Sequence, residues 1–245
     1  MTTAPGFRVE PVTSLVDLLV FESREKASTA AAGLLAGQLK TTLGLNGQRA
    51  ASLVVSGGST PGMCFDRLSR EALEWSNVTV IPSDERWVPA EDPDSNEGLI
   101  RSRLLQKQAN KASVLPFYRA GIEAVQAPSL IEKDLADLPR PFSATLLGMG
   151  EDGHFASLFP DLTDLQKALD PQGRAQCIKV QTGGSPHLRI SLTLSAILDS
   201  AQIVLLIFGE SKLQVYEAAK SGDGRYPVES LLRLARRPLT VVWAP

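Results

Sequence analysis

Residues 146–160 read LLGMGEDGHFASLFP, and in this run an apolar strand end passes into a turn that contains three glycines. Such a cluster of glycines indicates a backbone that turns tightly or lies close against another group. Asp152 and His154 stand two residues apart in this turn. Because open α/β sheets bind ligands at strand exits and histidine exchanges protons near neutral pH, the pair is a candidate catalytic site. A structural turn, in which Asp152 caps the next helix and His154 is merely exposed, fits the same residues.

A second glycine-rich loop follows the apolar run at residues 51–55 and reads SGGSTP. The backbone N–H groups of Gly57 and Gly58, with the hydroxyls of Ser59 and Thr60, precede a predicted helix. Together they favour an anion site, most often one for phosphate. The loop is neither a Walker A motif, because no Gly-Lys-Ser/Thr follows, nor a dinucleotide fingerprint, because the third glycine is missing. A plain polar strand-to-helix turn is the other interpretation.

A third strand, predicted at residues 78–82, is followed by the polar sequence SDER. Asp84, Glu85 and Arg86 are costly to bury, so they belong either to a site or to a solvated ion-pair cluster on the surface. Downstream, residues 92–98 form a turn and capping region, and a helix is expected to begin at Ser95 or Asn96.

Two further cations are candidates for an anion site. The apolar strand at residues 202–208 runs into GESK, which opens a helix extending to residue 219. Lys212 in the first turn opposes the helix dipole, and an anionic ligand would explain its presence there. Arg189 alternates with apolar neighbours over residues 187–194, so this pattern on its own places its side chain in solvent.

The alternation of strands and helices predicts an α/β fold with a mostly parallel sheet covered by helices on both faces. Further strands are expected at residues 176–180 and 239–243, and helices at residues 23–43 and 125–138. In a parallel sheet, the strand ends at residues 55, 82, 147 and 208 would all emerge on one edge. This convergence is the strongest indication that their polar residues belong to one site.

Composition restricts the possible functions. The chain has 245 residues, 43% of them apolar, and a net charge of −2, which gives no general attraction to nucleic acid or to anionic membranes. Cys64 and Cys177 form neither a disulfide framework nor a metal-binding pattern, and no stretch is long enough to span a membrane. We therefore predict a single cytoplasmic domain over residues 1–245, with residues 1–8 as a loose tail and no nucleic-acid, membrane or metal partner.

Six motifs in chain order closely resemble those of the 6-phosphogluconolactonases. They are SGGSTP (56–61), SDERWVP (83–89), DSNEG (94–98), LGMGEDGHFASLFP (147–160), RISLT (189–193) and GESK (209–212). The resemblance implies a Rossmann-like fold, no cofactor and no metal. It also implies hydrolysis of 6-phospho-D-glucono-1,5-lactone to 6-phospho-D-gluconate. The binding residues it suggests are Gly57, Gly58, Ser59, Thr60, Asp84, Arg86, Arg189 and Lys212, with the three cations holding the 6-phosphate.

A δ-lactone is an activated ester, so one positioned water molecule and one base suffice for its hydrolysis. We expect His154 to take the proton from this water and Asp152 to orient or charge-stabilise the imidazole. Ser157 lacks a nucleophile-elbow motif and a second base, so no serine nucleophile is expected. The enzyme is expected to be a monomer or a weak homo-oligomer.

The glucosamine-6-phosphate deaminases share the sheet and several motifs, and they are the main alternative. Their corresponding turn carries a glutamate just before the proline, where this chain has Phe159, which moves no protons. They also usually have Tyr-Val where this chain has Arg86 and Trp87. A sugar-phosphate sensor is less favoured, because such regulators carry a helix-turn-helix segment before the sensor domain. Only about twenty residues precede the first helix here.

Overall fold

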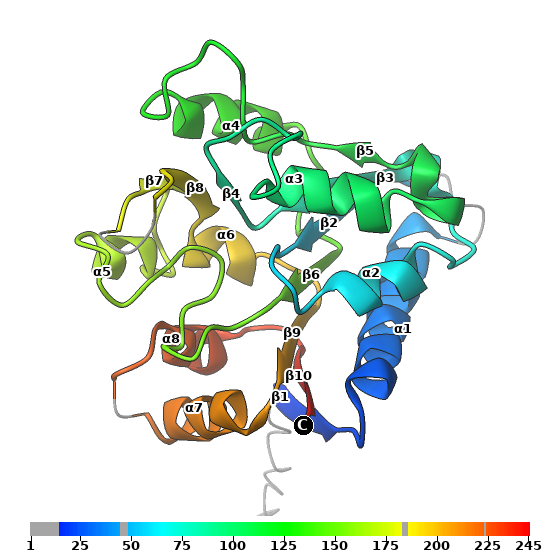
Figure 1. The fold of residues 1–245 in the computed structure, drawn as a ribbon, viewed down its shortest axis with the longest axis vertical. Helices are drawn as coiled ribbons and strands as arrows, with labels where there is room; N and C mark the ends of the chain where they lie inside the picture. The colour runs from blue at the N-terminus through cyan, green and yellow to red at the C-terminus, as the bar shows by residue number, and fades with distance from the viewer. Residues whose placement is uncertain (1–14, 45–48, 183–185, 223) are drawn as a thin grey trace, which may run out of the picture.

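A seven-stranded parallel sheet forms the centre of the computed structural model, which describes residues 15–44, 49–182, 186–222 and 224–245 (Figure 1). The spatial order of its strands is β1-β10-β9-β6-β2-β3-β5. Their bounds are β1 Val16–Val20, β2 Ala51–Val55, β3 Val78–Pro82, β5 Ser113–Val114, β6 Ala144–Leu147, β9 Ile203–Phe208 and β10 Leu239–Ala244. Each neighbouring pair runs parallel, which confirms the predicted mostly parallel sheet.

The central strands are mostly apolar because both of their faces are covered. All five residues of β2 are buried, and alternate side chains enter different cores. Leu53 and Val55 pack into one cluster, while Val54 packs into the other. The same alternation holds in β9, where Val204 and Leu205 point to opposite faces of the sheet.

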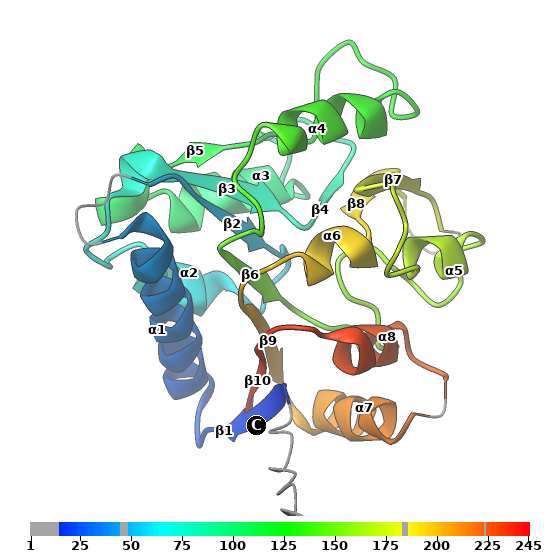
Figure 2. The same ribbon diagram turned by 180° about the vertical axis from the view of Figure 1, so that it is seen from behind.

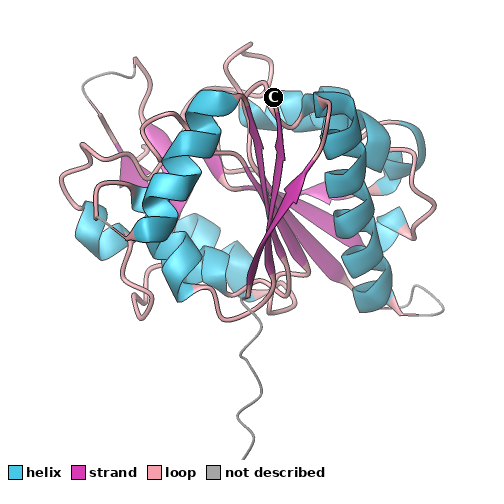
Figure 3. Ribbon diagram, turned by 90° about the horizontal axis from the view of Figure 1, so that it is seen from below, coloured by secondary structure: helices cyan, strands magenta, loops and turns pink. Residues whose placement is uncertain are grey.

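Helices cover both faces of the sheet, as the alternation of elements predicts (Figures 2 and 3). On one face lie α1 and α2, with α1 crossing β9, β10, β6 and β2. The hydroxyl of Ser23 caps α1 by accepting from the N–H of Lys26, and Ala31, Leu35 and Leu39 form its buried stripe. The other face carries α4, α6, α7 and α8. Because both cores share one sheet, we infer a single domain.

The helix bounds are α1 Arg24–Leu43, α2 Gly62–Leu68, α3 Asn96–Leu99, α4 Ala127–Ala136, α5 Leu165–Ala168, α6 Leu194–Leu198, α7 Glu210–Ser221 and α8 Pro227–Leu234. A π-helical turn, Ile100–Leu104, continues α3, and short 3₁₀ helices span Trp75–Asn77 and Lys107–Lys111. No helix in the described part of the chain is both long and apolar enough to cross a membrane.

A small antiparallel sheet of three strands lies beside the main one, and the sequence did not predict it. Its order is β4-β8-β7, with bounds β4 Asp84–Arg86, β8 Arg189–Leu192 and β7 Cys177–Val180. Most of the SDER segment that follows β3 is therefore a strand of its own. Strands β1 and β5 and helices α6 and α8 were also not predicted. The tail predicted at residues 1–8 lies outside the described residues.

Candidate active site

The loops after β2, β3, β6 and β9 meet at one edge of the sheet, because these four strands are adjacent and parallel. This confirms the convergence predicted from the sequence. A cleft at this edge is lined by Ser56, Gly57, Gly58, Ser59, Thr60, Asp84, Arg86, Asn96, Gly148, Met149, Gly150, His154, Ala156, Arg189 and Lys212. All of the predicted site residues except Asp152 are among them. Ser56 and Asn96 are lining residues to which the sequence analysis gave no role.

Asp152 lies beside His154 and holds its imidazole ring. The Nδ1 atom of His154 is 2.5 Å from Oδ1 of Asp152, and this oxygen also accepts the backbone N–H of His154 at 3.2 Å. A carboxylate accepts hydrogen bonds, so Nδ1 carries the proton and Nε2 keeps a free lone pair. The next helix, α5, begins only at Leu165, so Asp152 does not cap it, and its carboxylate instead holds the backbone of the turn and the imidazole ring of His154.

Glycine is required at two positions in this turn. A Cβ atom on Gly150 would lie 2.3 Å from the ring of His154, so only glycine leaves room for the imidazole. Gly153 has a φ of +75°, a conformation that side-chain-bearing residues rarely adopt. The turn is closed by a hydrogen bond of 2.9 Å from the N–H of Gly150 to the carbonyl of His154.

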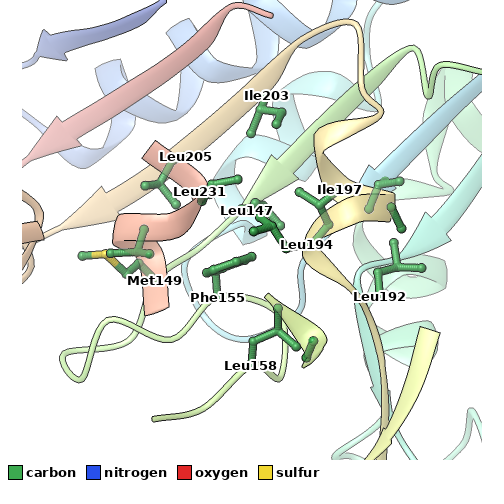
Figure 4. Packing of buried hydrophobic residues seen from close by; sticks show 14 of the residues in the cluster. Leu147, Met149, Phe155, Leu158, Leu192, Leu194, Ile197, Ile203, Leu205 and Leu231 are labelled. Carbon is green, nitrogen blue, oxygen red and sulfur yellow. The ribbon is translucent and has the colours of Figure 1, made fainter. Parts of the chain in front are cut away.

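The core of the protein fixes the turn on both sides (Figure 4). Leu147 and Met149 precede it, Phe155 and Leu158 follow it, and all four side chains are buried in one apolar cluster. The carbonyl of Gly153 also accepts the N–H of Val228 at the start of α8. The catalytic candidate is therefore held by rigid elements on either side, which is what a preorganised site needs.

Phe159 packs directly against His154. The centroids of their rings are 4.3 Å apart, and the guanidinium carbon of Arg189 lies 5.4 Å from the Phe159 ring on its way to the cleft. The Phe159 ring thus contacts both the histidine and a partly buried cation. Unlike a carboxylate, the phenyl ring of Phe159 cannot transfer a proton to or from a ligand in the cleft.

Arg86 and Arg189 are paired residues of neighbouring antiparallel strands, and both line the cleft. The side chain of Arg189 is 18% exposed and lies 3.7 Å from the carboxylate of Asp84, so the solvent-facing position predicted from alternation is wrong. Burial lowers the pKa of Arg189, and the neighbouring Arg86 contributes to the same shift. In the described part of the chain, Nε of Arg86 is buried without a hydrogen-bond partner.

Lys212 lies in the first turn of α7 and brings a third cation to the cleft. Burial lowers its pKa, and the carboxylate of Glu151 partly opposes this effect. The hydroxyl of Ser211 donates to Glu151 at 2.9 Å, which ties the start of α7 to the turn after β6. Three cations but only one carboxylate, that of Asp84, line the cleft, so it is suited to an anion that carries more than one charge.

Asp84 and Glu85 are both buried, which excludes the solvated ion-pair cluster considered from the sequence. The carboxylate of Asp84 accepts the hydroxyls of Ser83 at 3.0 Å and of Ser157 at 2.5 Å. The hydroxyl of Ser157 therefore donates to Asp84, and the described residues show no hydrogen bond between Ser157 and His154.

The carboxylate of Glu85 organises the start of α3. It accepts the backbone N–H groups of Arg86, Asn96 and Glu97 at 2.7, 2.8 and 2.6 Å, and the hydroxyl of Ser95 at 3.0 Å. Burial raises the pKa of Glu85, and these four hydrogen bonds oppose that shift. A contact between strand β4 and a helix ten residues later could not be read from sequence spacing.

Within the described residues, no group of three or more His, Cys, Asp or Glu side chains could hold a metal ion.

Comparison with known proteins identifies the family. The model of the glucosamine-6-phosphate isomerases/6-phosphogluconolactonase family matches residues 22–243. A 6-phosphogluconolactonase from Pseudomonas aeruginosa is 41% identical, with 94% of this chain and 95% of the relative covered. The crystal structure of a 6-phosphogluconolactonase from Shewanella baltica superposes with a TM-score of 0.88 at 37% identity, covering 94% of this chain and 98% of that one. A monomeric glucosamine-6-phosphate deaminase shares the fold, with a TM-score of 0.71 at 22% identity over 93% of this chain and 97% of its own. The chain belongs to the glucosamine-6-phosphate isomerase/6-phosphogluconolactonase family.

Proposed function

We propose that this protein hydrolyses 6-phospho-D-glucono-1,5-lactone to 6-phospho-D-gluconate, the second step of the oxidative pentose phosphate pathway. The observation that carries the proposal is the cleft itself, which combines an Asp-oriented histidine with three cations. A phosphate ester at one end and an electrophilic carbonyl at the other match these two features. The names of the relatives described above support the same substrate.

The 6-phosphate is held by Arg86, Arg189 and Lys212. Ser59 and Thr60 add their backbone N–H groups and their hydroxyls. Guanidinium groups bind phosphate oxygens through paired, charge-assisted hydrogen bonds, so cations from separate elements fix its orientation as well as its charge. The phosphate then serves as the anchor that positions C1 of the lactone beside His154.

His154 acts as the general base. Its Nε2 takes a proton from a water molecule whose oxygen attacks C1, and Asp152 stabilises the imidazolium that forms. Collapse of the tetrahedral intermediate breaks the bond between C1 and the ring oxygen, which receives the proton back from His154. A positioned base of this kind contributes about 10²- to 10⁴-fold in rate.

The oxyanion that develops on C1 needs hydrogen-bond donors. The N–H of Gly150 already donates to the carbonyl of His154, so it is not available for this purpose. We therefore assign the donors to the backbone of the Gly57–Gly58 loop, which lines the same cleft.

The decisive experiment is hydrolysis of 6-phosphoglucono-δ-lactone, freshly generated from glucose 6-phosphate, near neutral pH. Wild type, His154→Ala and His187→Ala are compared with spontaneous ring opening in buffer. We expect wild type and His187→Ala to be active, because His187 lies outside the cleft lining, and His154→Ala to lose most of the rate. Full activity in a folded His154→Ala variant would remove the histidine as base while keeping the lactonase.

An inactive, well-folded wild type would remove the lactonase function. Glucosamine 6-phosphate is then the next substrate to test, since the family includes enzymes that act on it. Phe159 against His154 argues against that reaction, because a phenyl ring cannot supply the second proton transfer. Release of ammonia from glucosamine 6-phosphate would overturn this argument.

We further propose that the enzyme works in the cytoplasm as a monomer or weak homo-oligomer, without a nucleic-acid or membrane partner. Both cysteines are free and buried, which suits a reducing compartment. The net charge of −2 gives no attraction to polyanions. Sedimentation at several protein concentrations tests the oligomeric state.

A further inference from the structure

Asn96 is a residue of the cleft wall to which the proposed function gives no role. It is 3% exposed and lies at the start of α3. Its side-chain Nδ2 donates to the backbone carbonyl of Asp84 at 2.8 Å. Because only the amide nitrogen can donate to a carbonyl, this bond fixes which end of the carboxamide is the oxygen.

The carboxamide oxygen occupies the space beside Gly57. A Cβ atom built on Gly57 would lie 1.8 Å from Oδ1 of Asn96, so the oxygen stands where any other residue at 57 would have its side chain. Both residues line the cleft. In the described part of the chain, no group donates a hydrogen bond to this oxygen. The oxygen is not one of the fully buried side-chain atoms without a partner, so it is accessible from the cleft and can accept a hydrogen bond from a bound molecule.

The backbone at Asn96 is fixed before any ligand arrives. Glu85 accepts the N–H groups of Asn96 and Glu97 and the hydroxyl of Ser95. The carboxamide is thus held at both ends, by Glu85 through its backbone and by Asp84 through its side chain. Such a support is what a binding group needs to discriminate between ligands.

The chemistry of Oδ1 selects the part of a ligand that it can contact. An acceptor oxygen repels phosphate, which the cations Arg86, Arg189 and Lys212 bind instead, and the reacting carbon belongs beside His154. The remaining part of a sugar-phosphate lactone is a row of hydroxyl groups, and a hydroxyl is a hydrogen-bond donor.

We propose that Oδ1 of Asn96 accepts a hydrogen bond from a hydroxyl group of the sugar chain, between the phosphate and the reacting carbon. Asn96 is then a specificity-determining residue that favours hydroxylated ligands over their deoxy analogues. The identity of the ligand rests on the proposed function. Recognition by a fixed acceptor is selective because a ligand that covers it without supplying a hydroxyl leaves that acceptor unpaired.

Equilibrium binding tests this contact independently of turnover. The titrated ligands are inorganic phosphate, 6-phosphogluconate and its 2-, 3- and 4-deoxy analogues, and the proteins are wild type, Asn96→Leu and the matched control Asn110→Leu, at an exposed asparagine. We expect Asn96→Leu to weaken 6-phosphogluconate about tenfold or more, as loss of a buried hydrogen bond implies, and to leave phosphate binding within about twofold. Asn110→Leu is expected to match wild type.

The deoxy ligands separate contact from structure. One of them should bind wild type more weakly than 6-phosphogluconate, and Asn96→Leu should no longer distinguish these two ligands. Equal loss in wild type and variant for every deoxy ligand would overturn the inference, as would a wild type that binds all of them alike. If Asn96→Leu does not fold, Asn96→Ala takes its place with the same expectations.

The binding test and the lactonase assay can reject the two proposals independently of each other. Coupling between Asn96 and one hydroxyl in a protein that does not hydrolyse the lactone would remove the proposed function and keep the contact. Hydrolysis of the lactone without such coupling would keep the proposed function and remove the contact.

Discussion

Arg86 and Arg189 lie directly opposite each other across the antiparallel pair β4–β8, and both side chains line the cleft. Like charges at directly opposed positions of a sheet destabilise it. The carboxylate of Asp84, 3.7 Å from Arg189, compensates only part of this charge. The fold therefore retains an arrangement that a bound anion would relieve.

Sulfate should stabilise the folded protein through this pair. A ligand that binds only the folded state adds about 2.7 kcal/mol to the free energy of unfolding at a concentration of one hundred times its Kd. We expect the midpoint of thermal unfolding to rise with sulfate in wild type and to rise much less in Arg189→Ala. Sodium chloride at matched ionic strength is the control, and an equal response to both salts would contradict a specific site.

Asp152→Asn should lower kcat and leave KM nearly unchanged. An asparagine amide can donate to Nδ1 of His154, which favours the wrong tautomer, while the phosphate-binding cations stay in place. We expect a loss of about 10²-fold or more in kcat, within the usual range for a misaligned base. Steady-state kinetics on the lactone measure both parameters. A parallel rise in KM would indicate instead that the whole turn has moved.

Anion binding should weaken with rising pH earlier than an ordinary lysine would cause. Burial lowers the pKa of Lys212, so the free protein loses this charge at a lower pH than it would with an exposed amine. Sulfate, whose own charge stays constant, is the suitable probe, with its Kd measured by calorimetry from neutral to alkaline pH. Lys212→Arg should remove this dependence, since arginine stays charged throughout. An identical pH profile in wild type and Lys212→Arg would show that another group is responsible.

Neither cysteine should react in the folded protein. Burial raises the pKa of both Cys64 and Cys177 to about 12, and the thiolate is the reactive form. A thiol-specific reagent at mildly alkaline pH should label both residues only after denaturation. Because the folded state favours the protonated thiols, their contribution to stability is full below the ordinary pKa of 9.0 and is lost as the pH rises from there to about 12. Rapid labelling of native protein would exclude this interpretation.

Glu85→Gln should destabilise the fold. The glutamine keeps one acceptor oxygen, but its amide group would face backbone N–H groups at the start of α3 that now donate to a carboxylate. Leaving buried donors unpaired costs about 1–3 kcal/mol each, so urea unfolding should show a loss of this order. Glu123→Gln, at an exposed position, is the control and should behave as wild type.

The core strands and their order along the chain could be predicted because their sequences are locally consistent. Residues 51–55 and 78–82 are mostly apolar runs between turn signals, and the structure has strands with these bounds. Strand β1 escaped prediction because most of its residues are partly exposed at the edge of the sheet, so its pattern is weak. Helix α8 had a readable signal, with Pro227 at its first turn and Val228, Leu231 and Leu232 at helical spacing.

The site was predictable where chemistry is local and unpredictable where it depends on distant contacts. The Asp152–His154 pair lies within one turn, so its spacing alone suggested the interaction. Arg189 was misplaced because alternation gives the face of a strand and not what covers that face. Only the pairing of β8 with β4, about a hundred residues earlier, turns Arg189 toward the cleft. The roles of Glu85 and Asn96 depend on the same long-range folding of β4 against α3.

The empty Cβ position of Gly57 and the carboxamide of Asn96 share one volume. The side chain of Asn96 therefore restricts position 57 to glycine. A larger residue at position 57 is tolerated only together with a smaller one at position 96, and that exchange removes the acceptor. The loop at residues 57–60 and the start of α3 thus constrain each other's sequence, although Gly57 and Asn96 lie 39 residues apart along the chain. In a library of random variants, a larger residue at position 57 should be harmful when Asn96 is present and better tolerated when position 96 carries a smaller residue.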